Sequence, residues 1–239
     1  MKTLKMSFLA MIVMIAGTIT VKAQTADEVI DKYAQAIGGK DAWKKISSMK
    51  MEGSMSAQGQ EIGVTVTWVH NKAMRTDISI MGMTGYNIIT NKDGWMFFPW
   101  MGHTKAEALT ADQVSKSQEQ LDLQNAKLFD YKGQGNKVEY LGKDDIEGTA
   151  CHKVKVTMKS GTEKTLFFDA SNYYLIRETQ KVTVDGKEQE AVSSLSNYQK
   201  QSNGLVVPMS MDQGMGETKI TSVEFNKTFE DAVFKPTTN

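Results

Sequence analysis

The chain is poor in cysteine, proline and histidine, with one, three and three of these residues among 239. The single cysteine, Cys151, has no second cysteine with which to form an intramolecular disulfide. A zinc site built from cysteine pairs is excluded for the same reason, and no two of the three histidines have the spacing of metal ligands. We therefore expect no metal and no cofactor, and a fold that is stabilised by packing alone.

Long apolar runs are also scarce, and the longest stands near the start. The segment MKTLKMSFLAMIVMIAGTITVKA has Lys2 and Lys5 ahead of an apolar run over residues 8–16, and it ends in a small-residue site. This layout predicts a secretory signal peptide over residues 1–23, cleaved after Ala23. The run is short for a transmembrane anchor. No cysteine stands at the cleavage point, so we expect no lipid anchor on the exported chain.

Charge of one sign is not in excess either. The chain has 28 basic and 28 acidic residues, and 25 basic against 28 acidic ones remain without the predicted signal peptide. The predicted mature chain is therefore slightly acidic. This balance argues against nucleic acid as a partner.

No arrangement of reactive side chains indicates catalysis. Cys151 and His152 are adjacent in a segment with strand alternation, so their side chains should point to opposite faces and cannot exchange a proton. The acidic group of Asp144, Asp145 and Glu147 is explained as a charged turn between two strands, since it lacks the donor pattern of a calcium loop. We expect a protein without catalytic residues, not an enzyme.

What the sequence does contain is strand alternation over most of its length. After a helix that begins at a Thr25–Glu28 capping box and ends at Gly38-Gly39, apolar and polar residues alternate in segment after segment. The pattern predicts an α+β protein with a single strongly curved antiparallel sheet of about eleven strands. Such a sheet would form an incomplete β-barrel, with helices covering its concave mouth. Residues 24–239 are expected to form one domain.

The polar stretch over residues 110–128 is predicted to be a helix that covers this mouth. It begins with a second capping box, at Thr110 and Gln113, and its apolar residues Val114, Leu121 and Leu128 are sparse. A helix with so few apolar residues cannot be deeply buried. We expect it to act as a movable cover.

The segment GWMFFPWMGH has seven consecutive apolar residues, at positions 95–101, after the turn Asn91-Lys92-Asp93-Gly94. In a strand, such a run needs apolar contacts on both faces. One interpretation turns Trp95, Phe97 and Pro99 toward the concave interior and packs the residues between them under a helix or loop. The other interpretation is that the run is packed core on both faces, with its proline at an edge of the sheet.

The apolar positions of the alternating strands are the candidate lining of a ligand cavity. They are Val64, Val66, Trp68, Ile78, Ile80, Trp95 and Phe97. The predicted mature chain also holds 12 of the 16 methionines. Methionine either fills gaps in a core or forms an adaptable apolar binding surface, and the sequence leaves both open.

The order of these features resembles the periplasmic lipoprotein-carrier (LolA/LolB-like) superfamily, and in particular the secreted outer-membrane lipoprotein-sorting-like proteins of Bacteroidetes. The resemblance rests on the signal, the helix ending AIGG, the turn NKDGW, and the phrases NYYLIRE, SNGLVVP and FNKTFEDAVFKP. It implies an incomplete barrel whose cavity accepts acyl chains. It also implies that Arg75, in NKAMRTD, tethers the lid as an arginine on an early strand does in the carriers.

The resulting functional hypothesis is a periplasmic carrier for a lipid or an acylated lipoprotein. It would make transient contact with a membrane or with membrane-bound donor and acceptor proteins. A sensor or protein-interaction module on the same fold is the alternative. The sequence does not identify the ligand.

Overall fold

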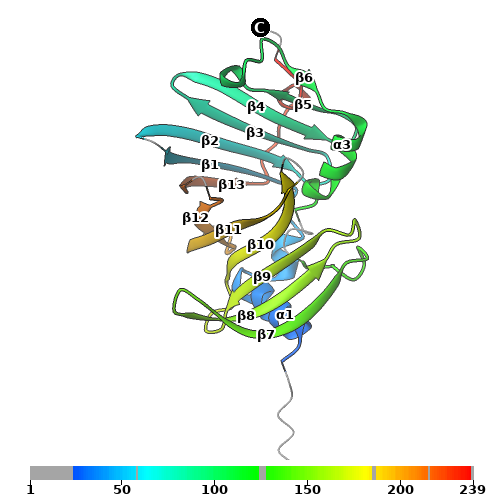
Figure 1. Ribbon diagram of the computed structural model, residues 1–239, viewed down its shortest axis with the longest axis vertical. Coiled ribbons are helices and arrows are strands. Elements are labelled where there is room, and N and C mark those ends of the chain that lie inside the picture. The colour runs from blue at the N-terminus through cyan, green and yellow to red at the C-terminus, as the bar shows by residue number, and fades with distance from the viewer. Residues whose placement is uncertain (1–23, 58, 124–127, 185–186, 215, 238–239) are drawn as a thin grey trace, which may run out of the picture.

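The computed structural model describes residues 24–57, 59–123, 128–184, 187–214 and 216–237 (Figure 1). The predicted signal peptide lies outside these residues. Within them, thirteen strands form one antiparallel sheet in the order β6-β5-β4-β3-β2-β1-β13-β12-β11-β10-β9-β8-β7. The two edge strands, β6 and β7, do not pair with one another, so the sheet is open. The α+β class is confirmed, with more strands than the eleven or so expected.

The strands are β1 (Ser48–Ala57), β2 (Gln60–Val69), β3 (Ala73–Ile80), β4 (Met83–Thr90), β5 (Gly94–Phe97), β6 (Glu107–Ala108), β7 (Lys137–Ile146), β8 (Thr149–Thr157), β9 (Glu163–Asp169), β10 (Leu175–Val184), β11 (Lys187–Lys200), β12 (Val206–Asp212) and β13 (Glu217–Phe225). The helices are α1 (Ala26–Ala36), α2 (Lys40–Trp43) and α3 (Ala111–Ser117), with 3₁₀ turns η1 (Pro99–Met101), η2 (Gln118–Leu121) and η4 (Asp231–Phe234). In the described part of the chain, no helix is both long and apolar enough to cross a membrane.

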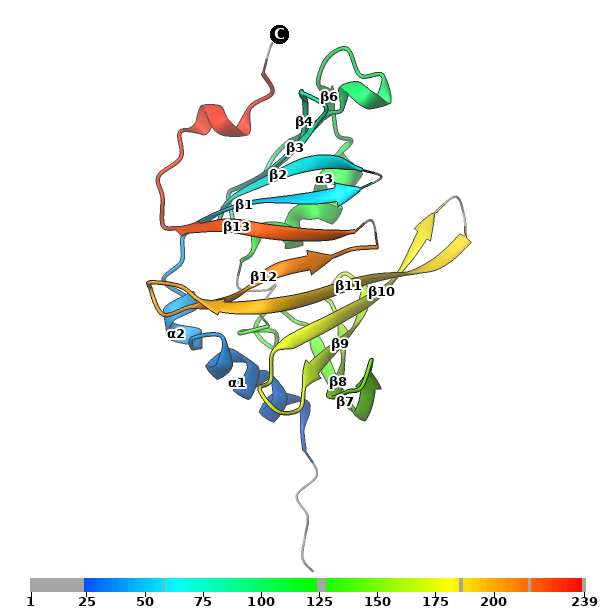
Figure 2. The ribbon, with the colours of Figure 1, turned by 90° about the vertical axis from the view of Figure 1, so that its left-hand side faces the viewer.

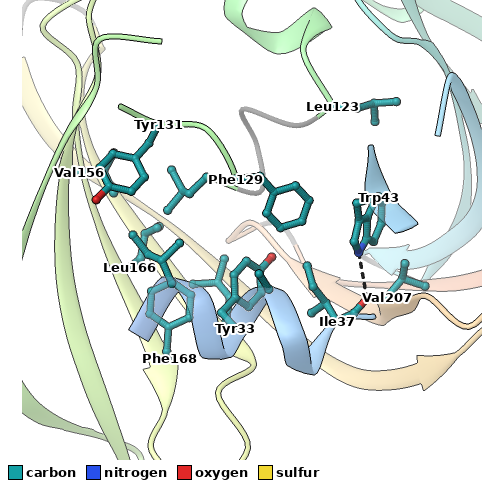
Figure 3. Close-up of a cluster of buried hydrophobic side chains, with 14 of the residues drawn as sticks. Tyr33, Ile37, Trp43, Leu123, Phe129, Tyr131, Val156, Leu166, Phe168 and Val207 are labelled. Atoms are coloured by element: carbon teal, nitrogen blue, oxygen red, sulfur yellow. Dashed lines mark hydrogen bonds between the residues drawn. The ribbon is translucent and has the colours of Figure 1, made fainter. Parts of the chain in front are cut away.

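Helix α1 begins as the sequence predicts. The Thr25 hydroxyl accepts a hydrogen bond from the Glu28 N–H, and the Glu28 carboxylate accepts one from the Thr25 N–H. Its buried side chains, including Tyr33, pack into the main core. Figure 3 shows Phe168 and Leu166 of β9 toward the first turns of this helix and Val207 of β12 beyond its last turn, next to Ile37. The helix therefore packs against the sheet from β9 to β12.

The two faces of the sheet are distinguished by register. Directly opposite residues of neighbouring antiparallel strands point to the same face. Val64, Val66 and Trp68 lie opposite Ile78, Thr76 and Met74. Trp68 and Met51 belong to the same apolar cluster as α1, so we call this face the inner face and the opposite one the outer face.

The outer face of β3–β5 carries a second apolar core. On β4, Ile88 and Tyr86 lie opposite Trp95 and Phe97 of β5. The same two residues lie opposite Arg75 and Asp77 of β3, the neighbouring strand on the other edge of β4. The C-terminal segment packs onto these residues through Phe229, Val233 and Phe234. Figure 2 shows this segment, in red, running along the side of the sheet away from α3.

The prediction that Trp95 and Phe97 turn toward the concave interior is therefore wrong. The register of β5 on β4 places both side chains on the outer face, where the C-terminal segment covers them. The chain then folds back over the inner face, where Phe98 and Trp100 lie over Gly85. A Cβ at position 85 would stand 2.6 Å from the Trp100 ring, so only glycine permits this contact. The apolar run thus contacts both faces of the sheet, with residues 95–100 half-buried and Met101 66% exposed.

Between residues 110 and 128 the structure has a short helix where the sequence predicts a long one. α3 begins with the expected capping box of Thr110 and Gln113 but ends at Ser117, and η2 follows it. The carbonyl of Leu121 accepts hydrogen bonds from Trp68 Nε1 (3.1 Å) and from the Asn71 N–H (2.8 Å). Bonding to the sheet therefore replaces helical bonding at this point. Residues 124–127 lie outside the described residues.

Candidate functional site

A groove runs along the inner face of the sheet. It consists of two adjoining cavities of about 380 and 410 Å³, and Trp68 and Met74 line both. We call the two together the inner groove. The smaller cavity lies over β1–β3 and β12–β13, and its lining is mainly apolar: Met51, Val64, Val66, Met211 and Ile220. We call it the apolar end.

The larger cavity lies between β8–β10 on one side and α3, η2 and Leu128 on the other. Its apolar side chains are Leu128, Val156, Met158, Leu166 and Leu175. Its polar side chains come from both walls. Lys164, Glu178 and Gln180 stand on the sheet, and Lys116, Glu119 and Gln120 on α3 and η2. We call this cavity the polar end.

The sequence-predicted lining is partly assembled in the inner groove. Val64, Val66 and Trp68 line it. Ile78 and Ile80 lie on the same inner face, opposite Val64 and Ile62, but outside the groove lining. Trp95 and Phe97 lie on the outer face, as described above. Alternation within one strand placed the three β2 residues on one face, and the structure has them together on the inner face.

Methionines occur both in the core and along the groove. Met51, Met74 and Met211 line the inner groove, whereas Met49 and Met209 are buried in the main core. A flexible, polarisable side chain suits a surface that must fit apolar ligands of varied shape. The groove therefore has an adaptable lining.

Lys164 and Glu178 form an ion pair inside the polar end. Their Nζ and Oε1 atoms are 2.8 Å apart, and the side chains are 32% and 29% exposed. Burial and the nearby negative charge of Glu178 raise the pKa of Tyr33 on α1. The pair stands beside Gln180 and the apolar side chains of Leu166 and Leu175 on the sheet wall.

The segment that follows α3 is fixed to the end of β2 and the β2–β3 turn by three hydrogen bonds. Two go to the Leu121 carbonyl, as described above, and the Leu123 N–H donates to His70 Nδ1 at 3.3 Å. Gln118 Nε2 also donates to the Thr90 carbonyl at 3.0 Å. Sequence reasoning missed this attachment, because it depends on backbone carbonyls and on a histidine at a strand end that no pattern marks.

Arg75, the predicted lid tether, instead holds the C-terminal segment. Its Nη1 donates to the Val233 carbonyl at 2.9 Å, its Nε donates to both carboxylate oxygens of Asp77 at 2.9 Å, and its guanidinium carbon lies 4.5 Å from the Tyr86 ring centre. All of these contacts are on the outer face, away from α3. The lid-tether prediction is wrong because Arg75 alternates with the inner-face residues Met74 and Thr76 along β3.

Cys151 and His152 lie on opposite faces of β8, as strand geometry predicts. Burial raises the pKa of the Cys151 thiol, and Sγ donates to the Thr149 carbonyl at 3.3 Å. His152 is held by the Tyr140 hydroxyl at 3.1 Å and stacks on Tyr173, with ring centres 5.3 Å apart. These contacts give both residues structural roles. Among the described residues, no group of three potential ligands is positioned to hold a metal ion.

Comparison with known proteins gives matches only at the level of structure. No protein-family model matches the sequence, and no curated protein matches it. A LolA superfamily protein from Nitrosomonas europaea matches with a TM-score of 0.55 and 15% identity, over 89% of this chain and 98% of that one. A DUF1329 family protein from Desulfovibrio piger matches with a TM-score of 0.51 and 12% identity, over 87% and 96%. The expected resemblance is confirmed as a likeness of fold: the chain is similar in fold to a LolA superfamily protein.

Proposed function

We propose that the protein is an exported carrier that holds the acyl chain of a lipid or lipoprotein. In this proposal the open sheet is an incomplete barrel, the inner groove is the binding site, and α3 with η2 forms the cover. The observation that carries the proposal is the inner groove itself: two adjoining cavities on the inner face, one of them lined mainly by aliphatic and methionine side chains. The likeness of fold to a LolA superfamily protein supports it.

The apolar end has the size and chemistry that an acyl chain requires. Each of the two cavities is within the common volume range of small-molecule sites, about 300–1,000 Å³. Burial of methylene groups contributes about 0.8 kcal/mol each, so a chain of a dozen carbons needs little polar chemistry for its affinity. Glu52 also borders the apolar end. Its carboxylate accepts hydrogen bonds from Lys50 at 2.5 Å and from Ser222, so this charge already has partners within the protein.

The cover is built to open at small cost. α3 is a single helix of 7 residues with Val114 as its buried side chain, and η2 adds Leu121. The apolar side chains that hold this segment are Val114 and Leu121, and the buried Leu123 follows it. A net contribution of about 1 kcal/mol for each neutral hydrogen bond makes the attachment to the end of β2 and the β2–β3 turn weak enough to break during ligand exchange.

The setting that we propose is the periplasm. The signal peptide predicted over residues 1–23 would direct export, and the mature chain would begin with Gln24 rather than with a cysteine that could carry a lipid anchor. An unanchored carrier would take its ligand from a membrane or a membrane-bound donor and release it to an acceptor. Transfer from loaded protein to acceptor vesicles separates this role from that of a sensor, which would retain its ligand.

The test compares one charge on the inner face with the same charge on the outer face. Val64→Asp places a carboxylate in the apolar end, and Ser54→Asp places one on the outer face of the neighbouring strand. Water hydrates the new carboxylate in the empty groove, but an acyl chain would strip that water away. Delipidated wild type and Ser54→Asp should bind a fluorescent long-chain fatty acid equally well, and Val64→Asp should bind it at least tenfold more weakly.

Circular dichroism and the urea midpoint of each variant show whether the fold is retained. Equal binding by folded Val64→Asp and Ser54→Asp would remove the inner groove as the site. Failure of the wild-type protein to bind the fatty acid at all would contradict the carrier function.

A further inference from the structure

We propose that the polar end of the inner groove is a head-group site for a zwitterionic amphiphile, one that carries a phosphate and an ammonium group. This inference rests on the proposed function and adds the ligand's orientation and class. The acyl chain would lie in the apolar end, past Trp68 and Met74, and the head group would lie at Lys164 and Glu178.

The first step is the position of the ion pair. Lys164 lies opposite Gln180, and Leu166 lies opposite Glu178, so the two charges face each other diagonally across β9 and β10 on the inner face. Leu166 and Leu175 line the same cavity. Both charged side chains keep about a third of their surface exposed, and the cavity they line supplies the space around them.

The second step is what an acyl chain alone would do there. A hydrocarbon laid over the pair would remove the remaining water from both charges and return no hydrogen bond, which is heavily unfavourable. The part of the ligand at this end must therefore be polar. An ammonium of lysine has three donors, and a carboxylate has two acceptor oxygens, so both groups retain hydrogen-bonding capacity beyond their mutual contact.

The third step is the balance of charge. The sheet wall supplies one cation and one anion, Lys164 and Glu178. On the opposite wall, Lys116 is paired with Asp112 at 2.7 Å, and Glu119 also lines the cavity. A ligand of net charge would be repelled by one member of the Lys164–Glu178 pair. A zwitterion satisfies both, because its phosphate oxygens accept from Lys164 and its ammonium donates to Glu178.

The experiment measures which lipids the delipidated protein extracts from vesicles, by mass spectrometry of the recovered complex. Vesicles contain equal amounts of phosphatidylethanolamine and phosphatidylglycerol, and a second set offers a diacylated lipopeptide with an uncharged amide head. Wild type should prefer phosphatidylethanolamine by roughly tenfold, the effect of one hydrogen bond to a charged group. Glu178→Gln should lose this preference, because it leaves Lys164 free to bind the anionic lipid.

A matched control exists on the outer face. Lys155 and Glu163 form a similar ion pair, 2.6 Å apart, between β8 and β9. Glu163→Gln should leave the lipid preference unchanged. The double variant Lys164→Met, Glu178→Leu leaves no charge without a partner, so it should fold even if the single variant Glu178→Gln does not. It too should lose the preference, while an uncharged apolar probe, N-phenylnaphthylamine, should bind within about twofold of wild type, since hydrophobic burial alone holds it.

The outcomes separate the two proposals. A preference that survives Glu178→Gln and the double variant, with the apolar probe still bound, would show that the pair is only structural and would overturn the head-group site while the carrier function stands. Preferential extraction of the lipopeptide would overturn the zwitterionic class. A wild-type protein that binds neither the probe nor any lipid would overturn the proposed function, and the head-group site with it.

Discussion

Arg75 offers the sharpest test of how the structure assigns the two faces of the sheet. Arg75→Met keeps most of the aliphatic stem but removes the guanidinium, with its bonds to Val233 and Asp77 and its contact with the Tyr86 ring. Asp77 would be left without its cation. Because all these groups lie on the outer face, the change should loosen the C-terminal segment and leave the inner groove intact.

The expected loss of stability lies between that of a buried and a surface ion pair. Removing one partner of a buried pair costs about 3–5 kcal/mol, whereas exposed pairs contribute about 0.2–1 kcal/mol. Arg75 and Asp77 are 14% and 24% exposed, which places the pair nearer the buried limit. We expect Arg75→Met to lower the free energy of unfolding by about 2–3 kcal/mol. Arg75→Met combined with Asp77→Leu should recover at least half of this loss, since no unpaired carboxylate remains.

Urea unfolding measures the stability of these variants, and stopped-flow release of a fluorescent fatty acid measures groove opening. The release rate should stay within about twofold of wild type, because rate changes follow only the contacts that opening breaks. Unchanged stability together with a release rate raised tenfold or more would refute the reasoning. In that case Arg75 would be the lid tether that the sequence resemblance implied.

Three further predictions address the cover, the buried histidine and export. Trp68→Phe removes the Nε1 donor to the Leu121 carbonyl and should speed ligand release about fivefold, from the loss of about 1 kcal/mol; an unchanged rate would mean that this hydrogen bond does not hold the cover. Burial, and then the charges of Lys143 and Lys32, keep the pKa of His152 below its ordinary value of 6.5, so the unfolded chain takes up the proton first. Stability contributed by the neutral ring is therefore present above pH 6.5 and falls as the pH is lowered. Urea unfolding at pH 7.5 and 5.5 should show that the free energy of unfolding falls less between these pH values in His152→Phe than in wild type. Equal falls in the two proteins would contradict this prediction. Intact mass of the exported protein should correspond to a chain that begins after Ala23, and a retained leader or an added acyl group would count against this.

The sequence predicted those elements whose signals are local. The capping boxes at Thr25 and Thr110 start α1 and α3 where expected, because each depends on side chains three residues apart. Alternation in β2 identified the inner-face side chains of that strand. Both signals lie within one short segment, so no knowledge of the rest of the fold was needed.

The misplaced residues depend on distant contacts. Ile88 and Ile89 are both apolar, so the sequence of β4 does not say which one faces inward, and the faces of Trp95 and Phe97 follow from the pairing of β5 with β4. The C-terminal segment that covers these residues comes from more than a hundred positions further along the chain. The length of α3 likewise depends on a carbonyl bonded to Trp68 in another element.

The measurement that tests the carrier proposal most directly is photocrosslinking with a long-chain fatty acid that carries a diazirine near its methyl end. After irradiation of the delipidated protein with this probe, tandem mass spectrometry identifies the labelled residues. The proposed function predicts labels at the apolar end, on Val64, Val66 and Trp68 of β2 and on Met74 of β3, and their loss in Val64→Asp but not in Ser54→Asp. Labels concentrated on the outer face, or no labelling above that of a denatured sample, would contradict it.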